Sequence, residues 1–182
     1  MSIESVSETE NQSPSVIGAA PEVAPEPGLG STPEAARLDE QIRVLKNGSC
    51  PSLTGRSTLG YQLGCKGESE LYLKVVSNTG SGFFSKEWIP CFVIEQLITG
   101  ADELTSTAFK ILFPNKSVNT GGFVMAVVKA LGLIQTNVEN SRWHEHIKGM
   151  TFEQVAIEAM VQEEDEVEKL AAAKGKRKHK EG

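Results

Sequence analysis

Two runs of residues in which apolar side chains take every second position constrain the fold more than any other feature. The apolar members of these runs are Leu59, Tyr61, Leu63, Leu71, Leu73 and Val75. Successive side chains of a β-strand point to opposite faces, so this alternation predicts two strands that each bury one face. The polar stretch "CKGES" between the runs is typical of a turn. The sequence therefore predicts an antiparallel β-hairpin.

Helical spacing of apolar residues predicts helices on both sides of the hairpin. Before it, apolar residues recur at intervals of three and four over residues 32–48, with Thr32 as the cap and Gly48 as the exit. After it, helices are expected over residues 90–100, 103–113 and 119–132, the last of these capped by Asn119 or Thr120. A strand and a turn are expected over residues 134–149, and a final helix begins at the cap Thr151.

These elements predict an α+β fold, in which a small antiparallel sheet packs with four to five helices. In the C-terminal half, the order of helix, turn, helix and hairpin is similar to the winged-helix plan. Residues 1–34 are rich in proline, acidic and free of aromatic residues. We expect them to be a disordered arm, residues 35–170 to form a single domain, and residues 171–182 to be a disordered basic tail.

The charge of the chain is concentrated at its ends. The net charge is −6, and residues 1–34 contain six Glu and no Lys or Arg, whereas residues 35–150 carry a net charge of +2. No secretory leader and no apolar run long enough for a bilayer is visible, so we expect a cytoplasmic protein without a membrane partner. Cys50, Cys65 and Cys91 form no CxxC pair and are expected to be free thiols.

Motifs that would indicate an enzyme are lacking from the sequence. There is no GxxxxGK[ST] loop, and the GxG in "NTGSGF" is not followed by a third glycine at the required spacing. His144 and His146 have no paired cysteine to complete a metal site, and the third histidine, His179, lies in the tail that is expected to be disordered. The sequence therefore predicts a non-enzymatic protein with neither a cofactor nor a bound metal.

The sequence favours a regulatory or accessory protein that associates with nucleic acid through a helix-turn-helix-like element. The polar turn "NKSVNTGG" offers Lys116, hydroxyl groups and backbone amides where a helix begins, and such a terminus can hold a phosphate. Lys129 and Met125 are expected on the outward side of this helix, whereas most of its other side chains are apolar and expected to be buried. The candidate nucleic-acid-binding residues are Lys110, Lys116, Ser117, Asn119, Thr120, Gly121, Gly122 and Lys129.

A protein partner is the alternative. The segment 77–88 is rich in Gly and Ser, yet it carries Phe83, Phe84 and Trp88. Exposed aromatic side chains are frequent anchors of protein interfaces, so we expect at least one of the three to be exposed in a contact site. The alternative interpretation, that they fill the core of the domain, applies chiefly to Phe84 and Trp88. On this hypothesis the protein is an adaptor or inhibitor.

Overall fold

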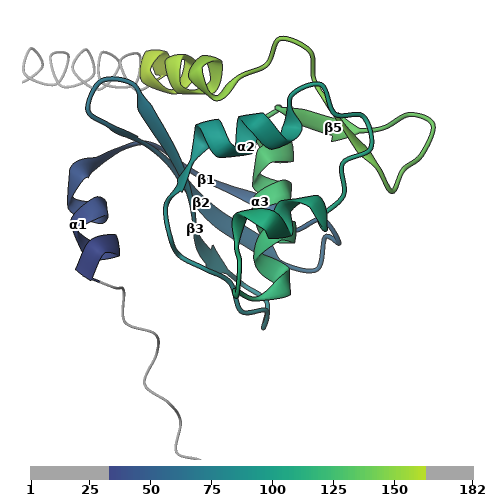
Figure 1. Cartoon of the computed structure of the whole chain (residues 1–182), viewed down its shortest axis with the longest axis horizontal. Helices are drawn as coiled ribbons and strands as arrows, with labels where there is room; N and C mark the ends of the chain where they lie inside the picture. The colour runs from purple at the N-terminus through teal and green to yellow at the C-terminus, as the bar shows by residue number, and fades with distance from the viewer. Residues whose placement is uncertain (1–32, 163–182) are drawn as a thin grey trace, which may run out of the picture. The chain divides into compact units, whose positions relative to one another are not determined.

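The structure, a computed structural model, describes residues 33–162 of the chain (Figure 1). The arm expected over residues 1–34 lies outside this range except for its last two residues, and the tail expected over residues 171–182 lies entirely outside it. The elements are α1 (Pro33–Gln41), β1 (Ile42–Pro51), β2 (Thr58–Lys66), β3 (Glu70–Asn78), β4 (Ile89–Pro90), α2 (Cys91–Ile98), the 3-10 helix η1 (Ala108–Leu112), α3 (Val118–Ala130), β5 (Ile134–Thr136), β6 (His144–His146) and a helix over residues 152–162.

The fold is α+β, as expected, with an antiparallel sheet in the order β1-β2-β3-β4 and a second sheet of β5 and β6. The expected hairpin is confirmed, because β2 and β3 pair from Lys66 and Glu70 at the turn to Leu59 and Asn78. Gly67 in the turn has a φ of +62°, a conformation that glycine adopts without strain. The sheet is thus a meander of strands that follow one another in the chain.

The helix expected over residues 32–48 is wrong in its second half. Helix α1 ends at Gln41, and the chain continues as β1, which pairs with β2. The register shifts between Val44 and Lys46, so Leu45 is an extra residue in a β-bulge. The bulge gives the buried residues Ile42 and Leu45 a spacing of three, which in the sequence is typical of a helix.

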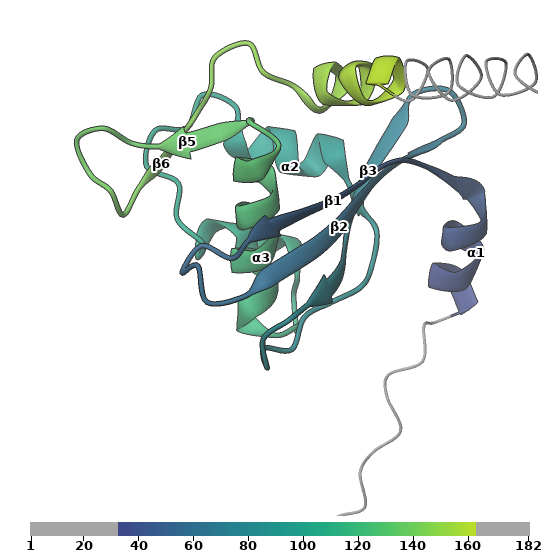
Figure 2. The same ribbon diagram turned by 180° about the vertical axis from the view of Figure 1, so that it is seen from behind.

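The core lies between the four-stranded sheet and the helices α2 and α3, which cover the same face of it (Figures 1 and 2). Helix α3 contacts β1, β2 and β3 on one side and η1 on the other. Its side chains are accordingly buried over most of its surface. The buried residues of α3 are Thr120, Gly121, Val124, Met125, Ala126, Val127 and Val128.

The helix expected over residues 103–113 is wrong in type and length, because only the 3-10 helix η1 forms there. Leu104 is in a β-bridge with His144, which keeps the start of this segment extended. The sequence "FPN" follows at residues 113–115, and Asn115 has a φ of 66°. These two constraints leave space for a single short helical turn.

The last described helix begins where the sequence indicates. Thr151 is its cap, because the Thr151 hydroxyl accepts a hydrogen bond from the amide of Gln154 at 3.3 Å. The amide of Phe152 donates to the Glu95 carboxylate of α2 at 2.7 Å, and the Phe152 side chain is fully buried. This helix is therefore fixed to α2. No helix within residues 33–162 is long and apolar enough to cross a membrane.

Candidate functional site

The two sites that the sequence predicts separately lie side by side. The segment 80–87 crosses the beginning of α3, where the amide of Ser85 donates to the Thr120 hydroxyl at 3.2 Å. The Phe84 and Phe123 rings pack edge to face with their centroids 6.0 Å apart. We call this region, residues 82–87 together with residues 116–123, the loop–helix surface.

Phe83 is the most prominent side chain of the loop–helix surface, because 84% of it is exposed. The preceding residue, Gly82, packs so closely on α3 that an added Cβ would lie 3.1 Å from Asn119 and from Phe123. Val118, the first residue of α3, is 67% exposed. The expectation that at least one aromatic residue of this loop is exposed is confirmed for Phe83, and the backbone beneath it is held in place.

The groups expected to hold a phosphate largely bond to one another. Ser117, and neither Asn119 nor Thr120, is the N-cap of α3, and its hydroxyl accepts from the amide of Asn119 at 3.4 Å. The amide of Thr120 donates to the Ser117 carbonyl at 3.0 Å. At Gly121 an added Cβ would lie 3.1 Å from backbone atoms of η1, so η1 covers this position. The beginning of α3 is therefore a well-satisfied helix start with few donors left for an anion.

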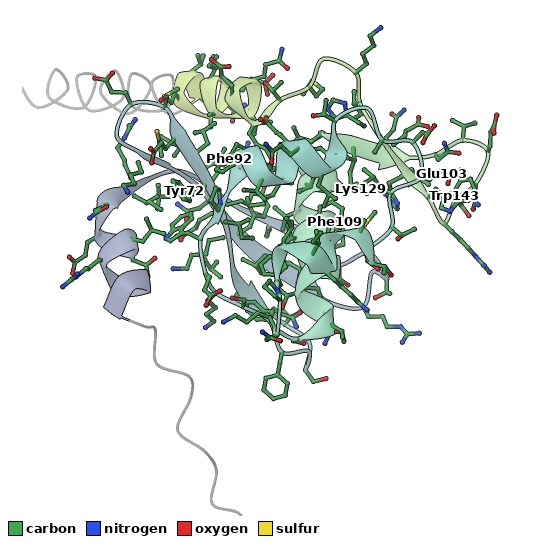
Figure 3. The ribbon with its side chains drawn as sticks, viewed as in Figure 1. Tyr72, Phe92, Glu103, Phe109, Lys129 and Trp143 are labelled. Atoms are coloured by element: carbon green, nitrogen blue, oxygen red, sulfur yellow. The ribbon has the colours of Figure 1, made fainter. Side chains whose placement is uncertain are left out.

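The candidate lysines do not gather at one place. The Lys116 ammonium pairs with the Glu87 carboxylate at 2.7 Å, and this hydrogen bond holds the pKa of Glu87 below its usual value. Lys129 lies at the far end of α3, about 18 Å along the helix axis, and donates to the Thr136 hydroxyl at 2.7 Å (Figure 3). Lys110 is exposed on η1. Met125 was expected beside Lys129 on the outward side, which is wrong because only 1% of it is exposed.

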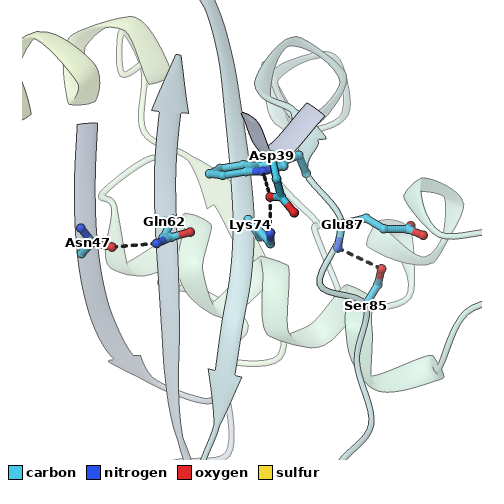
Figure 4. Close-up of polar contacts among 7 residues, drawn as sticks. Asp39, Asn47, Gln62, Lys74, Ser85 and Glu87 are labelled. Atoms are coloured by element: carbon cyan, nitrogen blue, oxygen red, sulfur yellow. Dashed lines mark hydrogen bonds and ion pairs between the residues drawn. The ribbon is translucent and has the colours of Figure 1, made fainter. Parts of the chain in front are cut away.

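Trp88 has a structural role that the sequence did not indicate. Its indole N–H donates to Asp39 of α1 at 2.6 Å, and the same carboxylate accepts from the Lys74 ammonium at 2.5 Å (Figure 4). The hydrogen bond from Lys74 lowers the pKa of Asp39 despite the opposing effect of burial. Trp88 therefore fastens α1 to the outer face of the sheet, and nothing in the sequence indicates a contact between residues so far apart in the chain.

His144 and His146 lie on β6. Within residues 33–162, no group of three or more His, Cys, Asp or Glu residues is placed to hold a metal ion. His144 is buried, and neither of its ring nitrogens has a hydrogen-bond partner in this part of the chain. Burial lowers its pKa, with a smaller contribution from the charge of Lys129. Burial therefore favours the neutral form of the His144 ring.

Comparisons of the chain with protein-family models, with curated proteins and with solved structures found no match.

Proposed function

We propose that the protein is a non-enzymatic binding protein that holds a protein partner at the loop–helix surface, with Phe83 as the anchor. The observation that carries this proposal is the 84% exposure of an aromatic side chain on a backbone that packs closely against α3. Aromatic residues are over-represented among the side chains that dominate binding energy. A monomer gains nothing in stability from so exposed a phenyl ring, whereas a partner that covers it gains apolar contact area.

The support beneath Phe83 strengthens the proposal. Phe84 is tied to Phe123, Ser85 to Thr120 and Glu87 to Lys116, so three successive contacts follow Phe83 along the loop. A loop that is already ordered loses less conformational entropy on binding, and this raises affinity. The polar residues beside Phe83 correspond to the rim of a typical interface, which surrounds an apolar centre.

The experiment places a photoreactive phenylalanine analogue at position 83 of the full chain, in the organism that encodes it. Val138, which is 91% exposed in the β5–β6 hairpin, is the matched control position. We expect a covalent adduct of discrete mass with one protein at position 83 and none at position 138. Absence of an adduct at position 83, or equal adducts at both positions, would contradict the proposal.

Nucleic acid remains a second candidate partner, because one feature of the topology favours it. The chain passes in order through helix α2, the bridge residue Leu104, η1, α3, β5 and β6. Strand β6 pairs with β5 on one side and bridges to Leu104 on the other. This order is similar to the winged-helix plan, in which a hairpin follows the second helix, and the similarity supports the candidate. Since α3 is buried on most sides, contacts here would come from Lys110, Lys116 and the hairpin, and they would position the protein without reading bases.

A titration of a random-sequence DNA duplex at two salt concentrations tests this second candidate. If the protein binds nucleic acid, Lys116→Glu weakens binding to every sequence. It also reduces the slope of the salt dependence by about one, which is the share of one phosphate contact. Arg43→Glu is the control, because Arg43 is also exposed but lies on β1, outside the loop–helix surface and the β5–β6 hairpin. Identical titrations of wild type and Lys116→Glu, or no binding by the wild type at low salt, would rule this candidate out.

A further inference from the structure

A concave surface lies away from Phe83, between the tip of the β2–β3 hairpin, the beginning of α2 and the helix over residues 152–162. It is a groove of about 650 Å³, within the range of sites that enclose small ligands or peptide side chains. Figure 3 shows Tyr72 and Phe92, which both line it, close to the helix that follows residue 151. We call it the hairpin–helix groove.

Contacts within the folded chain hold the walls of the groove in place. The Glu95 carboxylate of α2 accepts the amide of Phe152 at 2.7 Å, and this bond fixes the helix to α2. Phe152, Val155 and Ala156 are almost fully buried and seat the helix on the core. The groove therefore exists before any ligand arrives, so binding does not have to open it.

Apolar side chains are exposed along the groove. Phe92 of α2 is 61% exposed and Ile157 of the facing helix is 50% exposed, while Leu71 and Met160 are partly buried and pack on the core. Large apolar side chains that face each other across a concave surface are typical of binding grooves. The apolar walls alone do not say which ligand fits.

The charged groups of the groove indicate which kind of ligand fits it. Within residues 33–162, its lining includes the carboxylates of Glu68, Glu70, Glu95 and Glu153 but only one cation, Arg43. Glu95 is engaged by the Phe152 amide, which leaves three carboxylates at the rim against one guanidinium. An apolar groove with an acidic rim is electrostatically complementary to a chain with apolar and basic side chains. The aliphatic stems of Lys and Arg also suit walls of this kind.

We propose that the hairpin–helix groove binds a peptide segment of another protein in which leucine-like side chains alternate with lysine or arginine. The apolar side chains enter between Phe92 and Ile157, and the cations meet Glu68, Glu70 and Glu153. The Phe83 site does not contribute to this groove, so the inference is independent of the function proposed above.

The test uses the full chain and three labelled dodecapeptides, with alternating Leu and Lys, alternating Leu and Glu, and alternating Ser and Lys. Fluorescence anisotropy gives the affinities, and amide chemical shifts locate the binding site. We expect the Leu–Lys peptide to bind most tightly and to shift the amides of Leu71, Phe92 and Ile157. Equal binding of the three peptides, or shifts confined to residues 82–87, would overturn the proposal.

Variants separate the charge from the apolar contribution. We expect the double variant Glu68→Gln/Glu153→Gln to weaken binding of the Leu–Lys peptide about fivefold, as two exposed ion pairs would, and Phe92→Ala to weaken it at least as much. Glu139→Gln is the control for charge, because Glu139 is exposed in the β5–β6 hairpin. An equal effect of Glu139→Gln would mean that only net charge matters, and this would overturn the proposal.

A fourth peptide with the sequence of residues 171–182 asks whether the chain supplies its own ligand. That segment contains five Lys and Arg residues but no large apolar side chain. We expect it to bind more weakly than the Leu–Lys peptide. Tighter binding of the 171–182 peptide would make the basic end of this chain the occupant and would overturn the assignment to another protein.

Discussion

At the residue scale, the adjacent glycines Gly121 and Gly122 of α3 have different surroundings. A Cβ at Gly121 would lie 3.1 Å from backbone atoms of Ser106, Phe109 and Lys110, none of which can rotate away. A Cβ at Gly122 would have only the Ser106 Cβ nearby, at 3.7 Å. The close approach of η1 to α3 therefore depends on Gly121 alone.

We expect Gly121→Ala to lower the free energy of unfolding by about 1–2 kcal/mol, because η1 must move outward. The matched variant Gly122→Ala should raise it by about 0.5–1 kcal/mol, because alanine favours the helical backbone and has room there. Urea unfolding followed by circular dichroism measures both values. Equal effects of the two substitutions would mean that η1 yields easily and that its contact with α3 is loose.

His144 makes the stability depend on pH. Because burial lowers the pKa of His144 from the usual 6.5, the unfolded chain binds more protons than the folded one as the pH falls below 6.5. The free energy of unfolding is therefore greatest above pH 6.5. It decreases as the pH falls toward the pKa that His144 has in the folded protein. The lowered pKa values of Asp39 and Glu87 act in the same direction, but only below their usual values of 3.8 and 4.5.

Thermal unfolding at about pH 7.5 and about pH 5.5 isolates the histidine contribution. We expect the melting temperature of the wild type to fall between these pH values and that of His144→Leu to fall clearly less. The substitution suits the site because the ring is buried and neither nitrogen is bonded to another described residue. Parallel curves for the two proteins would show that His144 keeps its usual pKa in the folded protein.

At the element scale, one carboxylate of α1 bonds to two residues on the outer face of the sheet. Asp39 accepts hydrogen bonds from Trp88 and Lys74, and the Lys74 ammonium lies 5.2 Å from the centroid of the Trp88 ring. A helix of nine residues is not stable in isolation. We therefore expect the order of α1 to depend on this small cluster on the outer face of the sheet.

We expect Asp39→Ala to speed hydrogen exchange in α1 while lowering the global stability by less than about 1 kcal/mol, because the ion pair is partly exposed. Glu40→Ala is the control, since Glu40 is an exposed neighbour in the same helix. Alanine favours helices, so faster exchange cannot come from a poorer intrinsic propensity. If the two variants exchanged at the same rate, the cluster would not be what holds α1.

The same elements explain what the sequence predicts and what it does not. The β2–β3 hairpin is predicted because alternation and a turn are local features. The strand β1 is missed because the bulge at Leu45 reproduces a helical spacing, and pairing with β2 decides the outcome. The contact between Asp39 and Trp88 spans 49 residues and the one between Glu95 and Phe152 spans 57, and no local pattern records either. The hairpin–helix groove was missed for this reason.

At the scale of the whole molecule, the buried hydrophobic residues of the described range run from Ile42 to Ala159. We expect deletion of residues 1–30, an acidic segment without aromatic residues, to change the free energy of unfolding by no more than about 0.5 kcal/mol. Urea unfolding of the full and shortened chains makes the comparison. A larger loss would mean that the first thirty residues contribute to the core.

The bond between Glu95 and the Phe152 amide sets an order of events during biosynthesis. The residues of β1, β2 and β3 are synthesised early. Phe152, whose amide bonds to Glu95 of α2, is synthesised 57 residues after Glu95. At about 5–20 residues per second, the ribosome needs roughly 3–11 s to supply that stretch. During this interval the Glu95 carboxylate lacks the Phe152 amide, and the groove lacks the wall that residues 151–160 supply. Within residues 33–162, the hairpin–helix groove is therefore the last feature to be completed during synthesis, and we expect a nascent chain to bind no peptide there before residues 152–162 are made.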